Sequence, residues 1–164
     1  MTTGWELSQK MMPLIRKTIA ELPAGCFLDI ETATAEKDMH EATDLILRFM
    51  GGDMAVRVRR FKCGGDEKLA FDWSIRFRTR HGNKTEIHKF REGFARWYFI
   101  ARANEDETSL FDYCLIDLDK CRASNLFREE LWEINPNNDG SAGGYMSIQK
   151  VYELGCLLWP KEFI

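Results

Sequence analysis

Five arginines alternate with apolar or small residues in two neighbouring stretches of the sequence. Residues 56–59 read Val-Arg-Val-Arg, and residues 75–80 read Ile-Arg-Phe-Arg-Thr-Arg. Because successive side chains of a strand point to opposite faces, this spacing predicts two strands that each have an apolar face and a guanidinium face. Guanidinium groups bind phosphate oxygens in a bidentate manner, so the predicted chemistry is recognition of a phosphate backbone. With one lysine from the helix expected next, the predicted nucleic-acid-binding residues are Arg57, Arg59, Arg76, Arg78, Arg80 and Lys89.

The charge of the chain is unevenly distributed. The net charge is -3, but residues 55–102 hold 13 Lys and Arg against 5 Asp and Glu, and the rest of the chain holds 10 against 21. A basic middle between acidic ends favours a polyanionic partner, DNA or RNA, or a partner protein with complementary charge. The alternative is that the acidic ends neutralise the basic middle within the fold.

Other reactive residues show no catalytic or metal-binding spacing. The five cysteines lack a Cys-x-x-Cys pair, and the three histidines are isolated. This pattern argues against a zinc site, a disulfide framework and a nucleophilic cysteine, and it favours buried, reduced thiols. Trp73, Trp97 and Tyr98 lie near the basic segment; core packing is the favoured reading, and stacking on single-stranded nucleic acid is the alternative.

Three predicted strands position the arginines. An amphipathic helix is expected from about Met12 to Leu22. A hairpin follows over residues 43–60, with Gly51 and Gly52 as its turn, and a third strand over residues 71–80 is expected to lie beside the second. A two-residue turn at this glycine pair would place Ile46 opposite Arg57 and Asp44 opposite Arg59.

The remaining pattern predicts a helix capped by Thr85, strands over 97–103 and 110–118, a helix over 119–133, a loop over 135–144 and a strand over 145–149. This order predicts an α+β fold, a mixed and largely antiparallel sheet flanked by helices, in a single domain spanning residues 1–164. No apolar run is long enough to span a bilayer, and the N-terminal residues do not form a signal peptide, so a cytoplasmic protein is expected.

The helix and hairpin resemble the core of the PD-(D/E)XK nuclease superfamily, which has a restriction-endonuclease-like fold. The resemblance covers roughly residues 12–100 and rests on an acid near the start of the first hairpin strand ("TDLIL") and on the apolar alternation of the second ("AVRVRR"). The sequence is also similar to uncharacterised phage and prophage proteins. The family resemblance implies a Mg²⁺ site in which Asp44 is a metal ligand, because Mg²⁺ prefers oxygen ligands.

The family's Glu-x-Lys positions read Arg57-Val58-Arg59 here. Arg59 could replace the lysine, but an arginine at 57 cannot ligate a metal. The sequence therefore predicts a nuclease-like protein that binds nucleic acid without cleaving it and needs no cofactor. One alternative is an active, Mg²⁺-dependent nuclease with Asp44, Arg59 and a displaced acid such as Glu86, Asp72 or Glu41. The other is a protein-binding inhibitor of a host complex. An ion pair between Asp44 and Arg59 is favoured over metal ligation.

Overall fold

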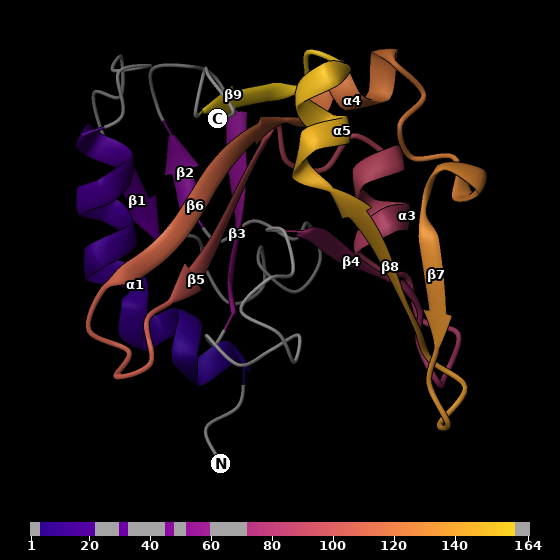
Figure 1. The fold of residues 1–164 in the computed structure, drawn as a ribbon, viewed down its shortest axis with the longest axis horizontal. Helices are drawn as coiled ribbons and strands as arrows, with labels where there is room; N and C mark the ends of the chain where they lie inside the picture. The colour runs from indigo at the N-terminus through magenta and orange to yellow at the C-terminus, as the bar shows by residue number, and fades with distance from the viewer. Residues whose placement is uncertain (1–3, 22–29, 33–44, 48–51, 60–71, 160–164) are drawn as a thin grey trace.

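The computed structural model describes residues 4–21, 30–32, 45–47, 52–59 and 72–159 (Figure 1). Helices and mostly antiparallel strands are combined in these ranges, which confirms the α+β class. The strands form two sheets instead of the one that the sequence predicted. No helix in the described part of the chain is long and apolar enough to cross a membrane.

The larger sheet has six strands in the order β1-β2-β3-β5-β6-β9. β3 and β5 are parallel, and the other neighbouring pairs are antiparallel. The strands are β1 (Ile30–Thr32), β2 (Leu45–Leu47), β3 (Gly52–Arg59), β5 (Trp97–Ala103), β6 (Leu110–Asp117) and β9 (Leu157–Trp159).

Helix α1 (Gly4–Glu21) covers one face of the larger sheet (Figure 1). Leu7, Met11, Ile15 and Ile19 recur every four residues and are almost completely buried. They pack in one cluster with alternate residues of two strands, which include Met54, Val56, Val58, Trp97 and Phe99. The predicted start near Met12 is wrong, because burial of Leu7 and Met11 extends the helix through the unfavourable Pro13.

The opposite face of the larger sheet packs against a second layer (Figure 1). That layer contains a three-stranded sheet, in the order β4-β8-β7, and three short helices. Its elements are β4 (Asp72–Arg78), α3 (Glu86–Arg91), α4 (Leu118–Ala123), β7 (Glu133–Pro136), β8 (Ala142–Ser147) and α5 (Ile148–Glu153). Since neighbouring residues of β5 point to opposite faces, Phe99 belongs to the α1 cluster and Tyr98 to this one.

The prediction that the third strand lies beside the second is wrong. β5 occupies the place next to β3, whereas β4 pairs with β8 in the other sheet. The run Trp97–Ile100 is buried on both faces, as is typical of a strand inside a layered sheet. The arginines of β3 and β4 therefore do not form one continuous row.

The predicted hairpin register is also wrong. Ile46 lies opposite Asp53, and Leu47 lies opposite Gly52, so Ile46 is not the partner of Arg57. Gly52 belongs to β3, where it pairs with Leu47. The Arg96 side chain packs against it, so that a Cβ on Gly52 would lie 2.7 Å from Arg96 Cβ, and Arg96 N–H donates to the neighbouring Asp53 O at 2.8 Å. The predicted partner Asp44 and turn residue Gly51 lie outside the described residues.

The C-terminal third differs most from the prediction. The helix expected over 119–133 already ends at Ala123. Two residues later, Asn125 has a positive φ of 53°, and the chain turns so that Leu126 and Phe127 enter the core. A 3₁₀ turn (Glu129–Leu131) and β7 follow. β8 begins inside the predicted loop, because its partners β4 and β7 satisfy the hydrogen bonds of its glycines.

Candidate functional site

Glu86 lies where the two sheets approach each other, at the first residue of α3. The preceding residue, Thr85, is buried, and its hydroxyl donates to Phe77 O of β4 at 3.2 Å. The same hydroxyl lies 2.8 Å from Nδ1 of His88. Thr85 thus ends the exposed loop after β4, begins the predicted helix and fixes the position of the carboxylate.

Three groups contact the Glu86 carboxylate. Arg57 Nη1 of β3 donates to Oε2 at 2.6 Å, and Arg76 N–H of β4 donates to the same oxygen at 2.9 Å. The Tyr98 hydroxyl of β5 donates to Oε1 at 3.2 Å. One carboxylate therefore connects the central strands of the larger sheet to the edge strand of the smaller one.

The charges of this cluster stabilise one another. Burial pulls the pKa of Glu86 upward, but the Arg57 charge and the donated hydrogen bonds outweigh it and leave this pKa below its ordinary value. The Glu86 charge raises the pKa of Arg57. Burial, followed by the Glu86 charge, raises the pKa of Tyr98 well above its ordinary value. At neutral pH the cluster is thus a neutralised ion pair with a neutral phenol.

The structure brings the predicted binding residue Arg57 to the predicted catalytic residue Glu86. A cation bound to Glu86 Oε2 would have to displace the Arg57 guanidinium, which carries a like charge. The second predicted ligand, Asp44, lies outside the described residues, as does the alternative acid Glu41. Among the described residues, no group of three or more His, Cys, Asp or Glu could hold a metal ion.

Arg59 and Arg102 are register partners on the parallel strands β3 and β5. Arg102 also forms an ion pair with Asp112 of β6 through Nε at 2.6 Å. Asp72, the remaining candidate acid, lies in the field of both arginines, although burial and then Glu133 raise its pKa above the ordinary value. The predicted catalytic Arg59 therefore lies in a region of mixed charge.

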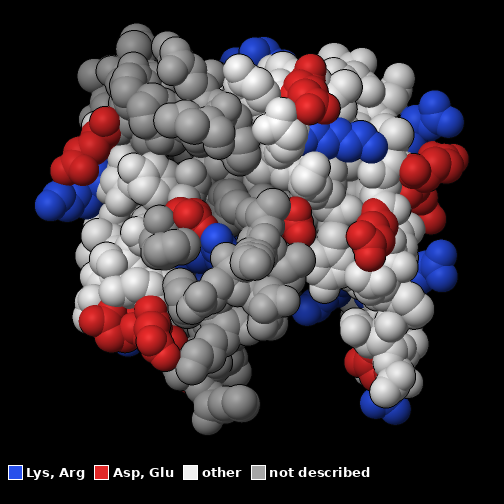
Figure 2. Space-filling model, viewed as in Figure 1, with Lys and Arg blue, Asp and Glu red and all other residues white. Residues whose placement is uncertain are grey.

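Arg76 and Arg78 of β4 are exposed, and the intervening Phe77 is buried in the core. The register between β4 and β8 shifts between the two arginines. Arg80 is exposed in the turn that follows, and Lys89 is half-buried on α3. The Arg78 guanidinium is 4.0 Å from the Glu129 carboxylate, and both side chains are largely exposed, so this pair neutralises little charge. Figure 2 shows both basic and acidic side chains at the lower end of the three-stranded sheet, which projects from the body of the molecule.

An aromatic ring that sequence reasoning missed lies beside this basic strand. Gly143 of β8 is the register partner of Arg76, and Tyr145, two residues further on, shares its face. A Cβ on Gly143 would lie 3.4 Å from Cε2 and the hydroxyl oxygen of Tyr145, so the ring lies over the glycine. The Gly-Gly-Tyr sequence was the available signal, but the sequence analysis assigned its glycines to a loop and Tyr145 to the following strand.

The predicted core roles of Trp73, Trp97 and Tyr98 are confirmed, since each is 2% exposed or less. Cys114, Cys121 and Cys156 are buried and free, as the cysteine spacing indicated. Cys26 and Cys63 lie outside the described residues.

The fold and the site thus define an α+β protein of two sheets that are joined by a neutralised ion pair, with exposed arginines on the edge of the smaller sheet. No family model matches the chain, and neither the curated proteins nor the solved structures include a match.

Proposed function

We propose that this protein binds nucleic acid through the exposed edge of its smaller sheet and does not cleave it. The observation that carries the proposal is that the exposed Arg76 and the ring of Tyr145 share one face of the smaller sheet, with the exposed Arg78 two residues further along β4, beyond a shift in register. Phosphate groups would bind the two guanidiniums and the nearby Arg80, and a base would stack on the half-buried Tyr145 ring. A charged edge with an aromatic platform is a common way to hold a single strand.

The ion pair between Arg57 and Glu86 favours binding without catalysis. Phosphodiester cleavage of the kind that the PD-(D/E)XK resemblance implies needs carboxylate oxygens that are available to a metal. Here the predicted displaced acid accepts hydrogen bonds from a guanidinium, a backbone N–H and a hydroxyl. The Glu86 carboxylate thus connects the two sheets. Because Arg57 is its ion-pair partner, we do not include Arg57 among the residues proposed to bind nucleic acid.

The test is fluorescence anisotropy of labelled single- and double-stranded DNA and RNA at several salt concentrations. We expect the double variant Arg76→Gln/Arg78→Gln to bind a single strand at least about tenfold more weakly than the unchanged protein. The slope of log K against log salt should become shallower by about 1.4, since each lost phosphate contact contributes about 0.7.

Lys10→Gln/Lys17→Gln is the matched control, because it removes the same formal charge from two exposed residues of α1. If both double variants lose the same amount of affinity for nucleic acid, the loss comes from net charge alone, and the proposed site is contradicted. Tyr145→Leu should weaken single-strand binding more than duplex binding. Cleavage of any of the four nucleic acids with Mg²⁺ or Mn²⁺ would overturn the non-catalytic part of the proposal.

A further inference from the structure

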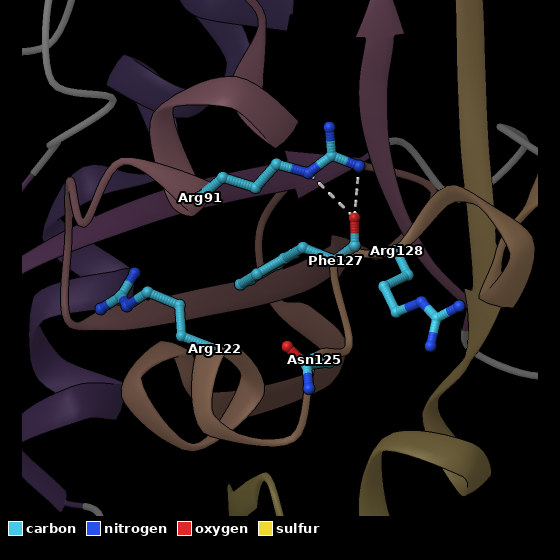
Figure 3. A pocket seen from close by; sticks show the side chains of 5 residues that line it. All are labelled: Arg91, Arg122, Asn125, Phe127 and Arg128. Carbon is cyan, nitrogen blue, oxygen red and sulfur yellow. Dashed lines mark hydrogen bonds between the residues drawn. The ribbon is translucent and has the colours of Figure 1, made fainter.

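A pocket of about 360 Å³ lies between α3, α4 and the segment that follows α4. Figure 3 shows its side chains: one arginine comes from each helix and a third from the following segment. Among the described residues, no carboxylate lines it. The lining residues are Arg91, Arg122, Asn125, Phe127 and Arg128.

Arg91 brings a positive charge to this pocket that no described acid neutralises by an ion pair. Its Nε donates to Phe127 O at 3.0 Å, and its Nη2 donates to the same carbonyl at 2.5 Å (Figure 3). A carbonyl oxygen accepts hydrogen bonds but carries no formal charge. The two bonds therefore fix the guanidinium at the pocket while leaving Nη1 available as a donor.

Arg122 is held even more firmly. Nη1 donates to Phe90 O at 2.9 Å, and Nη2 donates to Ala95 O at 3.1 Å and forms an ion pair with Asp119. Its Nε takes part in none of these contacts. The main-chain carbonyls of the α3 end thus hold this second guanidinium in place before any ligand arrives, which lowers the entropy cost of binding.

Arg128 and Asn125 supply the adjustable donors. The Arg128 side chain is 66% exposed, and its ion-pair partner among the described residues is the still more exposed Glu130, with Arg128 Nε at 3.5 Å from the carboxylate. The amide side chain of Asn125 makes no hydrogen bond to a described residue, and the positive φ of this residue directs the chain around the pocket. Both side chains can turn toward a bound anion.

We infer that this pocket binds the phosphate group of a small ligand or of a nucleic-acid end. Its polar side chains are mainly N–H donors, and its volume is at the lower end of the range of small-molecule sites, about 300–1,000 Å³. The Phe127 ring is only 4% exposed and offers no face for a base. The pocket is thus suited to an anionic group, and guanidiniums match phosphate oxygens in geometry and charge.

The test is a titration of the full chain with sodium pyrophosphate, followed by ¹H–¹⁵N NMR of backbone amides and arginine Nε–H groups at constant ionic strength. We expect saturable shifts at Asn125, Arg128 and the Nε–H of Arg122. Arg128→Gln should weaken the affinity at least about fivefold without changing stability, because this side chain connects no elements. Lys17→Gln on α1 is the control and should leave the affinity unchanged. Shifts that do not saturate, or equal losses in the two variants, would overturn the inference.

Three further probes distinguish the source of the phosphate: inorganic phosphate, a nucleoside monophosphate, and one oligonucleotide with a 5′-phosphate or a 5′-hydroxyl. A preference for the 5′-phosphorylated strand that Arg128→Gln abolishes would support a nucleic-acid end as the ligand, and only this arm rests on the proposed function. Pyrophosphate or mononucleotide binding without such a preference would support a free ligand. Since Arg76→Gln/Arg78→Gln should leave pyrophosphate binding intact, failure of one proposal is distinguishable from failure of the other.

Discussion

At the residue scale, the Glu86 carboxylate accepts hydrogen bonds from three different strands. Its sequence position suggested an acid displaced toward a metal site, but its contacts are with Arg57, Arg76 N–H and Tyr98. Both members of the ion pair are about one quarter exposed. Breaking such a pair from one side leaves a partly desolvated charge without its partner, which costs more than the pair itself contributes.

We therefore expect Glu86→Gln to lower the free energy of unfolding by about 2 kcal/mol at pH 7, a value reduced from the fully buried case because of the partial exposure. The double variant Arg57→Met/Glu86→Leu should lose less than the single one, since it leaves no charge behind. Urea unfolding of the three proteins measures the difference. Glu92→Gln is the control, because Glu92 is an exposed acid on the same helix segment. If Glu86→Gln lowers the free energy of unfolding no more than Glu92→Gln does, a structural role of Glu86 is contradicted.

The lowered pKa of Glu86 also predicts a pH dependence. A carboxyl group whose pKa is lower in the folded state stabilises the fold fully above its unfolded pKa, about 4.3, and this contribution is lost as pH falls through the folded pKa. Unfolding free energies of the unchanged protein should therefore decrease more steeply below about pH 4.5 than those of Glu86→Gln. Asp72 has the opposite shift, so Asp72→Asn should not remove this acid sensitivity. Parallel pH profiles for the unchanged protein and Glu86→Gln would refute the assignment.

At the element scale, helix α1 provides a test of why the predicted boundary was wrong. A proline is acceptable at the first position of a helix but costs about 3 kcal/mol relative to alanine in the interior. The structure places Pro13 in the interior and exposed. Pro13→Ala should accordingly stabilise the protein by about 1–3 kcal/mol in urea unfolding. No change or a loss would indicate that the helix begins near Met12, as the sequence alone suggested.

The contact between β8 and β4 is equally specific. A Cβ on Gly144 would overlap the ring of Phe77, which is buried opposite it. Gly144→Ala should therefore destabilise the protein by about 1–3 kcal/mol through overpacking. Phe77→Leu should lower the stability of the Gly144→Ala variant less than it lowers the stability of the unchanged protein. Gly143→Ala is the neighbouring control, because its Cβ would meet Tyr145 at an ordinary contact distance. Thermal unfolding of the four variants measures the coupling, and additive losses would contradict it.

Local pattern was sufficient for β3 and β4, in which apolar and charged side chains alternate, and for β5 and β6, which are short and mainly apolar runs. All four strands were predicted within a few residues, and Thr85 correctly marked the start of α3. The assignment of strands to sheets was not predictable, because the alternation of β4 fits a place beside β3 as well as one beside β8. The glycine-rich start of β8 carries no strand signal of its own and depends on its two neighbours. Candidate residues were therefore found one by one, but the contacts between Arg57 and Glu86 and between Gly143 and Tyr145 required the tertiary structure.

At the scale of the whole molecule, the layers share their central strand. Trp97 and Phe99 of β5 belong to the cluster under α1, whereas Tyr98 and Ile100 belong to the cluster beneath the smaller sheet. Neither cluster can lose its β5 contacts without disturbing the other. This arrangement favours a single cooperative unit.

The last prediction follows from that shared strand. Trp97 reports on the α1 cluster, and Trp73 reports on the cluster of the smaller sheet. Both indoles are buried, so their ¹H–¹⁵N resonances, assigned with Trp→Phe variants, should disappear at the same urea concentration and with the same slope. Glu86→Gln should move both midpoints together. Earlier loss of the Trp73 signal would instead mean that the smaller sheet opens independently while β5 remains folded with α1. The edge that we propose as the nucleic-acid-binding site would then belong to a separately unfolding part of the protein.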